Sequence, residues 1–514
     1  MNYIREPELT FGFGQKTADP RDGLILFGPH EKFESYQVKA GVIGTKSGIE
    51  SYLSFVETLS KPIYSIKKVY GKVKSNEIQR PSFPGFETVF GIKWPKQPEI
   101  QIEINETELK AKIAIGTKKQ RTSDLVDLYL QKIVDATSKE DIDINLWFIV
   151  VPRELYVACK PKSWGRDLSK GTENFIRSTK AGQVAMDFEE YPDYLETIAK
   201  VVDSSTDFHH LLKARLLIEK IKTPVQIYVE PTLKFRDKMM NKPLGEDMKA
   251  HVAWTTSTTV YYKLGKSPWK LNDVRDGVCY LGLVFKKLQH SGNKNSACSA
   301  AQMFLKDGDG SVFRGNIGAW QGKNDKDFHL DSSSSEQLLG MALDDYKEKW
   351  KKYPVEIFIH GRANFTSDEW GGFTTALSKR QASTKLVGIV IKDSYDLKMF
   401  RSAENQPCNY GVMRGLSFIV SEREAYLYTR GFIPRLNTAS SLEIPNPLHV
   451  RISRGDANIK EVLSDILALT KLNYNACIYG DGLPVTLRFS DNIGNILTAT
   501  DNMKSDMRQF KYYI

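Results

Sequence analysis

Four polar residues in the middle of the chain could together bind an anion. His209 and Lys213 are four residues apart in a segment of helical pattern, so a helix there places both on one face. Gln226 lies in the next apolar run, and Lys263 precedes Gly265, where backbone can approach a ligand closely. If the four residues converge at the end of an α/β sheet, where such folds bind ligands, they form a phosphate pocket. The His–Lys pair alone is more typical of a solvated helix face.

Three short acidic groups could suggest metal-dependent chemistry. The Asp-Gly-Asp-Gly sequence at residues 307–310 lies between two β-like runs, which is typical of a hairpin turn. The pairs at residues 344–345 and 368–369 fall on helix surfaces or in a first helical turn, where solvation and the helix dipole explain them. We therefore expect no metal-dependent catalytic site from these groups.

The composition is that of a soluble globular protein of two or three domains, with 514 residues, 41% apolar and 26% charged. The net charge of +10 favours a polyanionic partner such as nucleic acid, although many basic proteins bind none. Five widely spaced cysteines without a Cys-x-x-Cys pair predict neither a zinc site nor a disulfide framework. Since the chain begins without the apolar stretch of a signal peptide and has no long apolar window, we expect a cytoplasmic protein that does not enter membranes.

Three parts of the chain must position the candidate residues. Residues 1–115 are rich in Gly and Pro, with β-like runs at 23–29 and 86–90 and a helical stretch near 48–59. We expect a β-rich segment there that packs on the rest of the protein. Residues 116–265 hold an apolar run at 146–151, a helix beginning near Asp207 and a second run at 225–229. That order predicts a doubly wound, Rossmann-like α/β domain.

Residues 266–514 show a different order of elements. A strand at 278–285 is followed by two strands around residues 307–310, and then by a helix that opens with serines at 332–335. This helix would bury Leu339, Leu343, Tyr346 and Trp350 on one face. A strand at 355–359, a helix with a capping box at 366–369 and a strand at 386–391 follow. Three strands, helix, strand, helix, strand is the order of an RNase H-like fold, so the overall class is α/β.

The four candidate anion ligands stand in a pattern that resembles the MID domain of Argonaute proteins. The chain has His-x-x-x-Lys, then Gln ahead of Thr-Leu, then Tyr-Lys-x-Gly-x-x-Pro-Trp. The resemblance implies that His209, Lys213, Gln226 and Lys263 bind the 5′-phosphate of a guide strand. One departure is Lys266, where relatives usually have glycine; a further cation there does not oppose phosphate binding.

The aromatic and apolar end of the chain, residues 509–514, fits the same family. The resemblance implies that the Ile514 carboxylate reaches the MID pocket and shares a magnesium ion with the guide phosphate, so that Gln226 and Ile514 are the expected metal ligands. The alternative is a tail that packs on the core for stability alone.

The part from about residue 277 onward resembles the PIWI domain of the same family. The matching segments are residues 279–284, 358–362, 446–449, 469–475 and 482–486. No PAZ-like domain precedes them, which is the short form of the family. The family's catalytic aspartates would fall at Val284 and near Gly361, and only His449 is retained. One histidine without carboxylates cannot hold two metal ions, so the resemblance implies a PIWI domain that does not cut.

These features identify the chain as resembling a short prokaryotic Argonaute, the recognition subunit of a two-protein immune system. The resemblance implies a guide, usually RNA, that pairs with single-stranded DNA and activates a partner containing an APAZ region. In the most similar group that partner carries a TIR domain that degrades NAD(P)+, and the heterodimer oligomerises on activation. A sirtuin-like or nuclease partner remains open. So do an active guide-directed nuclease with unaligned carboxylates and a nucleic-acid-binding protein without a guide.

Overall fold

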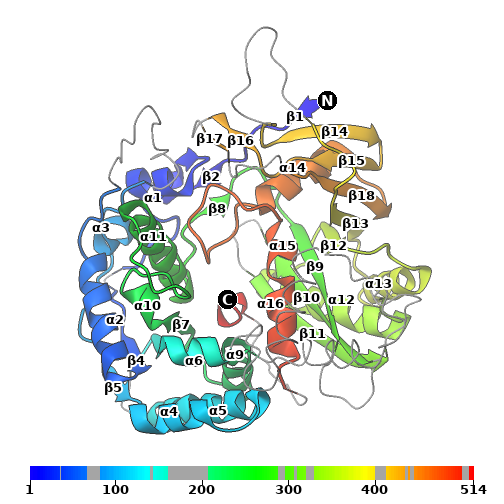
Figure 1. Ribbon diagram of the computed structural model, residues 1–514. Coiled ribbons are helices and arrows are strands. Elements are labelled where there is room, and N and C mark those ends of the chain that lie inside the picture. The colour runs from blue at the N-terminus through cyan, green and yellow to red at the C-terminus, as the bar shows by residue number, and fades with distance from the viewer. Residues whose placement is uncertain are drawn as a thin grey trace, which may run out of the picture.

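The computed structural model describes residues 1–34, 36–65, 81–138, 143–159, 207–287, 296–305, 310–319, 329–399, 412–434, 438–439, 445–500 and 509–514. Two sheets organise this part of the chain. A four-stranded sheet with its helices lies on the left of Figure 1, and a nine-stranded sheet lies on the right. The last residues of the chain lie between them, near the centre of the view.

The four-stranded sheet is parallel throughout and is mostly buried. Its strands are β4 (Ala40–Gly44), β5 (Ile100–Glu103), β6 (Leu146–Val151) and β7 (Val225–Val229), in the order β5-β4-β6-β7. Every residue of β4 and β6 is buried, as expected for central parallel strands covered by helices on both faces. The surrounding helices are α2 (Lys46–Leu59), α4 (Glu106–Ala114), α5 (Lys118–Thr137), α6 (Arg153–Ala158), α9 (Phe208–Ile218), α10 (Glu230–Leu233) and α11 (Glu246–Lys263).

The domain boundary expected at residue 116 does not separate two units, because β4 and β5 lie before it and pair with β6 in one sheet. The expected Rossmann-like part therefore includes much of the N-terminal segment. The strands at 146–151 and 225–229 and the helix after Asp207 are as predicted. The sequence pattern missed β4 because its Ala-Gly-Val-Ile-Gly stretch is short and rich in glycine.

The N-terminal segment is less β-rich than predicted. The run at residues 23–29 belongs to helix α1 (Pro20–Phe27), and the run at 86–90 is helix α3 (Phe86–Phe90). Residues at the start of α1 favour the helix over a strand, because the Asp19 side chain accepts a hydrogen bond from Arg21 N and Pro20 occupies the first turn. The helix expected near 48–59 is α2. Strands β1 (Asn2–Tyr3), β2 (Leu9–Thr10) and β3 (Lys16–Thr17) have two residues each, and a 3-10 turn spans Gly12–Gly14.

The nine-stranded sheet has the order β1-β14-β15-β18-β13-β12-β9-β10-β11. Its longer strands are β9 (Val278–Lys287), β10 (Ser296–Phe304), β11 (Gly310–Ala319), β12 (Glu356–Gly361), β13 (Lys385–Asp393), β14 (Leu416–Ser421), β15 (Glu424–Leu427) and β18 (Leu448–Arg454). Strands β9, β12 and β13 are parallel, and β10 and β11 form an antiparallel pair in which Phe304 faces Gly310. That register agrees with a hairpin, although residues 306–309 of the turn lie outside the described residues.

The predicted order of three strands, helix, strand, helix, strand is confirmed. Helix α12 (Ser332–Trp350) follows β11, and helix α13 (Ser367–Lys379) separates β12 from β13. The capping box of Thr366 and Glu369 is present. The expected apolar face of α12 is right for Leu339, Leu343 and Tyr346, whereas Trp350, in the last turn, is 45% exposed.

Short elements join the two sheets. Strand β2 pairs with β8 (Lys270–Leu271), so the start of the chain lies beside the segment that follows α11. The Trp269 indole donates to Lys471 O at 3.0 Å, and the Tyr474 hydroxyl donates to Trp269 O at 2.5 Å. The remaining elements are β16 (Phe432–Ile433), β17 (Thr438–Ala439), α14 (Ile459–Leu469), α15 (Val485–Arg488), α16 (Ser490–Leu497) and a 3-10 turn over Phe510–Tyr512. None of the described helices is long and apolar enough to cross a membrane.

A buried ion cluster fastens the N-terminus to the second sheet. The Glu6 carboxylate accepts from Arg414 Nε at 3.1 Å and from Lys471 Nζ at 2.7 Å. Burial by itself would raise the pKa of Glu6, but the two cations lower it below its ordinary value. Both cations are 3% exposed, so Glu6 provides the negative charge that makes their burial tolerable.

Replacing Glu6 with glutamine should therefore destabilise the protein strongly. Glu6→Gln leaves Arg414 and Lys471 buried without their carboxylate, and we expect the free energy of unfolding to fall by about 3–5 kcal/mol. Urea unfolding followed by tryptophan fluorescence measures the change. The matched control is Glu8→Gln, whose partner Arg5 is 86% exposed and whose loss should cost about 1 kcal/mol or less. Equal losses in the two variants would contradict this account.

Candidate functional site

Lys213 and Lys263 place two ammonium groups in the interior between the sheets, where their side chains are 2% and 1% exposed. Lys263 Nζ donates to Val225 O and to Gln226 Oε1, both at 2.7 Å. Lys213 Nζ donates to Ile514 O at 2.5 Å and to Tyr513 O at 3.2 Å. The predicted residues thus converge, and the end of the chain joins them.

Three elements bring these side chains together. Helix α9 begins at Phe208, where the Asp207 side chain accepts from His209 N at 3.2 Å, and it presents His209 and Lys213 one turn apart. Lys263 is the last residue of α11, where the helix dipole favours a cation. Gln226 is the second residue of β7, which is the edge strand of its sheet.

The site lies near the amino end of β7 and not at the carboxyl ends of the strands, where parallel α/β sheets usually bind ligands. The expectation of a pocket at the ligand-binding end of the sheet was therefore wrong in its location. The reason is that Lys263 is the last residue of a long helix whose end reaches the start of β7, where its ammonium group donates to Val225 O and Gln226 Oε1.

Burial and mutual repulsion lower the pKa values of the basic side chains at this site. Burial lowers the pKa of Lys213 to about 7. Burial, and then repulsion from Lys213, lower the pKa of Lys263 well below its ordinary value. The pKa of His209 is lowered by burial first, and then by Lys213, His210, Lys263 and Lys238. The site therefore holds more potential positive charge than its surroundings compensate, and an entering anion would stabilise the protonated lysines.

The end of the chain is buried beside this site, as expected. Tyr513 and Ile514 are 4% and 6% exposed. Phe510 is fixed between Phe304 and Phe489, with ring centroids 5.0 and 5.3 Å apart. The Tyr512 hydroxyl donates to Lys222 O at 2.8 Å. These contacts fix the end of the chain against both sheets and place its main-chain oxygens beside Lys213.

The two expected metal ligands, Gln226 and Ile514, both offer oxygen atoms of the kind that Mg²⁺ prefers. Each of these oxygens accepts a hydrogen bond from a lysine, Gln226 Oε1 from Lys263 and Ile514 O from Lys213. Within the described parts of the chain, no group of three or more His, Cys, Asp or Glu side chains could hold a metal ion. The residue types fit magnesium, but the ion would have to share its ligands with two ammonium groups.

The positions expected to correspond to catalytic carboxylates lie in the nine-stranded sheet. Val284 is in β9 and Gly361 ends the neighbouring strand β12, while the Val284 side chain lies outside the described residues. His449 is in β18, beyond β13. Its Nε2 is 2.6 Å from Glu424 Oε1, and its ring stacks on Tyr426. Local contacts within the sheet therefore occupy His449.

Two contributors to the lysine site were not predicted. Tyr513 supplies a main-chain oxygen, and Lys238 adds positive charge near His209. Neither has a sequence signal, because a main-chain contact leaves no trace in residue type and Lys238 is one of many exposed lysines.

Solved structures with a similar fold are Argonaute and Piwi proteins. Clostridium butyricum Argonaute, bound to a guide DNA and a 19-mer target DNA, matches with a TM-score of 0.63 and 16% identity over 99% of this chain and 54% of that one. Drosophila Piwi matches with a TM-score of 0.59 and 12% identity, covering 100% and 56% of the two chains. Aquifex aeolicus Argonaute matches with a TM-score of 0.53 and 14% identity, covering 100% and 57%.

The fold of this chain is therefore Argonaute-like, with a large mixed sheet. The chain spans about half the length of these structures. No protein-family model and no curated protein matches the sequence.

The burial of Lys213 should make stability depend on pH. Its folded pKa of about 7 lies below its ordinary value of 10.5, so the unfolded chain binds a proton that the folded protein releases. The contribution of Lys213 is complete above pH 10.5 and is lost as the pH falls toward 7, by about 1.4 kcal/mol per pH unit. Urea unfolding at pH 7, 8 and 9 should show this slope in wild type and a shallower slope in Lys213→Met. The exposed Lys222→Met is the control, and an unchanged slope in Lys213→Met would contradict the assignment.

Proposed function

We propose that this Argonaute-like chain binds a guide strand by its 5′-phosphate at Lys213 and Lys263 and pairs that guide with a target strand. The observation that carries the proposal is the convergence of two buried ammonium groups whose acceptors are two main-chain oxygens, one amide oxygen and an oxygen of the terminal residue Ile514. A phosphate ester fits this site because it brings two negative charges and several acceptor oxygens. The guide and target DNA held by Clostridium butyricum Argonaute support the same assignment.

In the proposed mechanism, Lys213 and Lys263 donate hydrogen bonds to the phosphate oxygens, and the bound anion favours their protonated forms. The Gln226 amide and His209 orient the phosphate from the strand and from the start of α9. These contacts fix the position of the guide without reading its sequence, and base pairing supplies the specificity. The net charge of +10 favours the binding of both the guide strand and the target strand.

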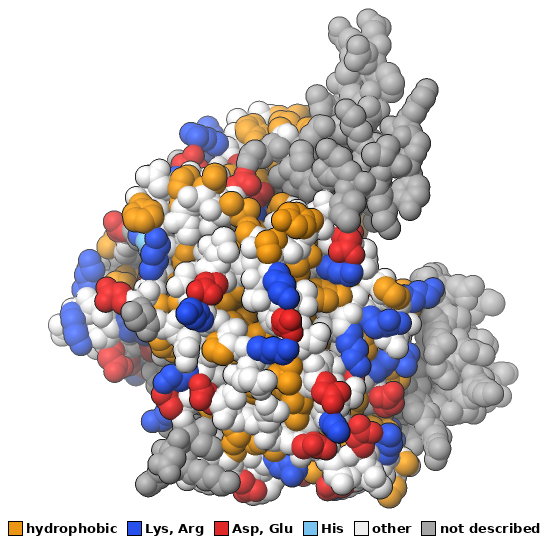
Figure 2. Space-filling model, turned by 90° about the vertical axis from the view of Figure 1, so that its left-hand side faces the viewer, with side chains coloured by type: hydrophobic (Ala, Val, Ile, Leu, Met, Phe, Trp, Pro, Cys, Tyr) orange, Lys and Arg blue, Asp and Glu red, His pale blue; other side chains and the backbone are white. Residues whose placement is uncertain are grey.

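The surface also bears on where nucleic acid could lie. On the side of the molecule covered by α2 and α3, the coloured basic and acidic side chains are interspersed over most of the view (Figure 2). A nucleic-acid backbone is attracted by a surface of one sign. We therefore propose that the guide and target lie on the inner side of the molecule, between the two sheets, beside the lysine site.

Magnesium is part of the proposal. When bound, the ion would supply further positive charge to the guide phosphate, with Gln226 Oε1 and an oxygen of Ile514 as its protein ligands. The lysines that now hold these oxygens would then turn to the phosphate.

We propose further that the chain leaves its target uncut and is not an enzyme. Val284 and Gly361 stand where the resemblance expects aspartates, and neither side chain can bind a metal ion. His449 faces Glu424 on the adjacent strand. Two-metal hydrolysis needs carboxylates that hold both ions, so these positions favour recognition without cleavage.

Recognition without cleavage needs a separate effector. We propose an APAZ-containing partner subunit with a TIR domain that degrades NAD(P)+. The two proteins would form a cytoplasmic heterodimer that serves prokaryotic immunity with an RNA guide and a single-stranded DNA target. This part of the proposal rests on the family resemblance of the motifs alone.

Guide binding should depend on the terminal phosphate and on Lys263. We expect the wild-type protein to bind a 5′-phosphorylated RNA at least about tenfold more tightly than its 5′-hydroxyl twin, which corresponds to about 1.4 kcal/mol for charge-assisted contacts. Lys263→Gln should abolish this preference, whereas Lys222→Gln, an exposed lysine, should preserve it. Fluorescence anisotropy measures the affinities, with EDTA testing the magnesium proposal. Equal affinity for both RNAs would contradict the proposed site, and a cut complementary DNA would contradict recognition without cleavage.

The partner can be tested by coexpression. We expect the chain to co-purify with the product of an adjacent reading frame, and the complex to consume NAD+ only with guide and complementary DNA together. Loss of this activity in Lys263→Gln, with the complex still assembled, would link the effector to the phosphate site. NAD+ consumption that does not depend on the target DNA would contradict a role of target recognition in activating the effector.

A further inference from the structure

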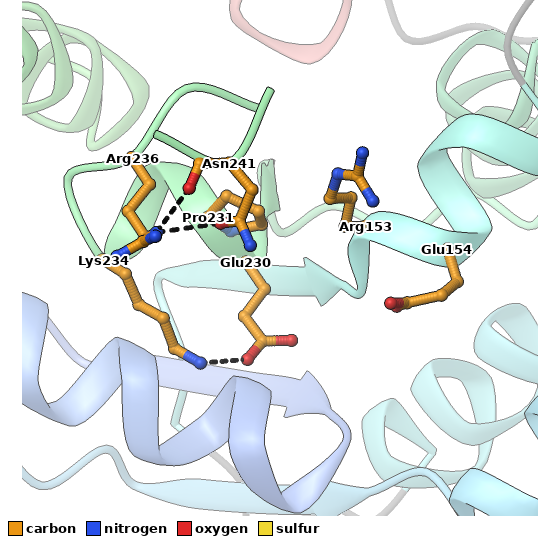
Figure 3. A pocket seen from close by; sticks show the side chains of 7 residues that line it. All are labelled: Arg153, Glu154, Glu230, Pro231, Lys234, Arg236 and Asn241. Atoms are coloured by element: carbon orange, nitrogen blue, oxygen red, sulfur yellow. Dashed lines mark hydrogen bonds and ion pairs between the residues drawn. The ribbon is translucent and has the colours of Figure 1, made fainter. Parts of the chain in front are cut away.

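A hollow lies at the opposite end of the four-stranded sheet from Gln226. It has a volume of about 370 Å³ and is lined by Arg153 and Glu154 on one side and by Glu230, Lys234, Arg236 and Asn241 on the other (Figure 3). Arg153 and Glu154 come just after the carboxyl end of β6, and Glu230 comes directly after that of β7. Parallel α/β sheets bind their ligands at this edge, and the volume suits a small molecule.

The two arginines of the hollow are held in place by oxygen acceptors. Arg153 Nε and Nη2 donate to Met239 O at 3.2 and 2.8 Å. Arg236 Nε donates to Asn241 O at 2.8 Å and to Asn241 Oδ1 at 2.9 Å. Since each planar guanidinium carries five N–H groups, these bonds fix its orientation and leave donors for a ligand. Little side-chain freedom remains to be lost on binding.

The loop that carries Arg236 and Asn241 is rigid. The Asp237 carboxylate accepts from Met239 N at 2.9 Å and from Met240 N at 2.6 Å. Arg236 N donates to Pro231 O, and Asn241 N donates to Asp237 O, both at 2.8 Å. The loop therefore holds one wall of the hollow in a fixed position.

The charges of the hollow favour an anion that also carries hydroxyl groups. Glu230 is neutralised by Lys234 at 2.6 Å and accepts from the Ser47 hydroxyl at 2.6 Å. The other charged side chains of the lining are Arg153, Arg236 and Glu154, which bring two positive charges and one negative charge. Guanidinium groups match phosphate oxygens, and a carboxylate at this edge of a sheet suits the hydroxyls of a ribose.

We propose that this hollow binds the ribose phosphate group of a nucleotide, with the phosphate at Arg153 and Arg236 and the sugar at Glu154. The hollow shares no lining residue with the lysine site, although Lys238 of the same loop adds positive charge near His209. Gln226 lies in β7 and Glu230 follows the end of that strand four residues later, about 13 Å away at the rise of a strand. The inference does not depend on the proposed guide binding, because it uses other residues.

The probe is adenosine 5′-monophosphate, and isothermal titration calorimetry measures its binding to the full-length protein. The protein carries the substitution Lys213→Gln, which disables the lysine site. We expect this variant to bind the nucleotide but not adenosine. Adding Arg236→Gln should weaken binding about tenfold or more, as expected for the loss of a charged phosphate contact. Lys242→Gln, an equal charge change on the same loop but outside the hollow, should alter the affinity less than about twofold.

Wild-type protein saturated with 5′-phosphorylated RNA provides a second measurement if Lys213→Gln fails to fold. Nucleotide binding that is lost with Lys213→Gln or guide loading, and is unaffected by Arg236→Gln, would overturn the proposal. A 5′-hydroxyl RNA that displaces the nucleotide from the Arg236-dependent site would support the ribose phosphate chemistry and assign it to a strand. If the protein bound no guide, the effect of Arg236→Gln on nucleotide binding would still test the hollow. The experiment therefore distinguishes failure of this proposal from failure of the proposed guide binding.

Discussion

The burial of Lys213 and Lys263 is the constraint on which the arrangement between the sheets depends. Removing an ammonium group from water is costly unless oxygen atoms replace the lost hydration. The fold supplies those oxygens from Val225 and Gln226 at the start of an edge strand and from Tyr513 and Ile514 at the end of the chain. None of these four partners is an acidic side chain, and the Ile514 carboxylate offers one negative charge to two ammonium groups, so part of the electrostatic cost stays unrelieved. The result is a site that is stable when empty and is further stabilised by an anion.

The same contacts join the two halves of the protein. Phe510 is held by Phe304 and Phe489 of the nine-stranded sheet and its helices, and three and four residues later the chain contacts Lys213 on α9. A ligand that takes the place of Ile514 O at Lys213 would therefore act on a segment anchored in the other half. Coupling of this kind needs no long pathway, because one short stretch contacts both bodies.

The sequence predicted the features that depend on local patterns. The buried runs of β6 and β7, the Asp207 start of α9 and the capping box of α13 all rest on periodicity or on helix-start chemistry within a few residues. The convergence of His209, Lys213, Gln226 and Lys263 came from the motif resemblance, and the structure brings these residues together.

Long-range pairing could not be predicted in the same way. Strands β4 and β5 join their sheet across distances in sequence that no local pattern encodes, so the boundary at residue 116 was misplaced. The helix α1 was mistaken for a strand because an unbroken apolar run fits either element when it is short. The pocket at Arg153 and Arg236 was missed because arginines are common on surfaces, although their position after two parallel strands was a usable signal.

The pairing of the first residues with much later ones has a consequence for synthesis on the ribosome. Tyr3 pairs with Leu416, and Leu9 pairs with Leu271. At a translation rate of ~5–20 residues per second, the partner of Tyr3 emerges roughly 20 to 80 s after Tyr3 itself. During that interval strand β1 lacks its native partner strand and is exposed to proteases and to other nascent chains. Synonymous codon changes that slow translation between these positions would therefore lower the yield of folded protein without altering a single residue.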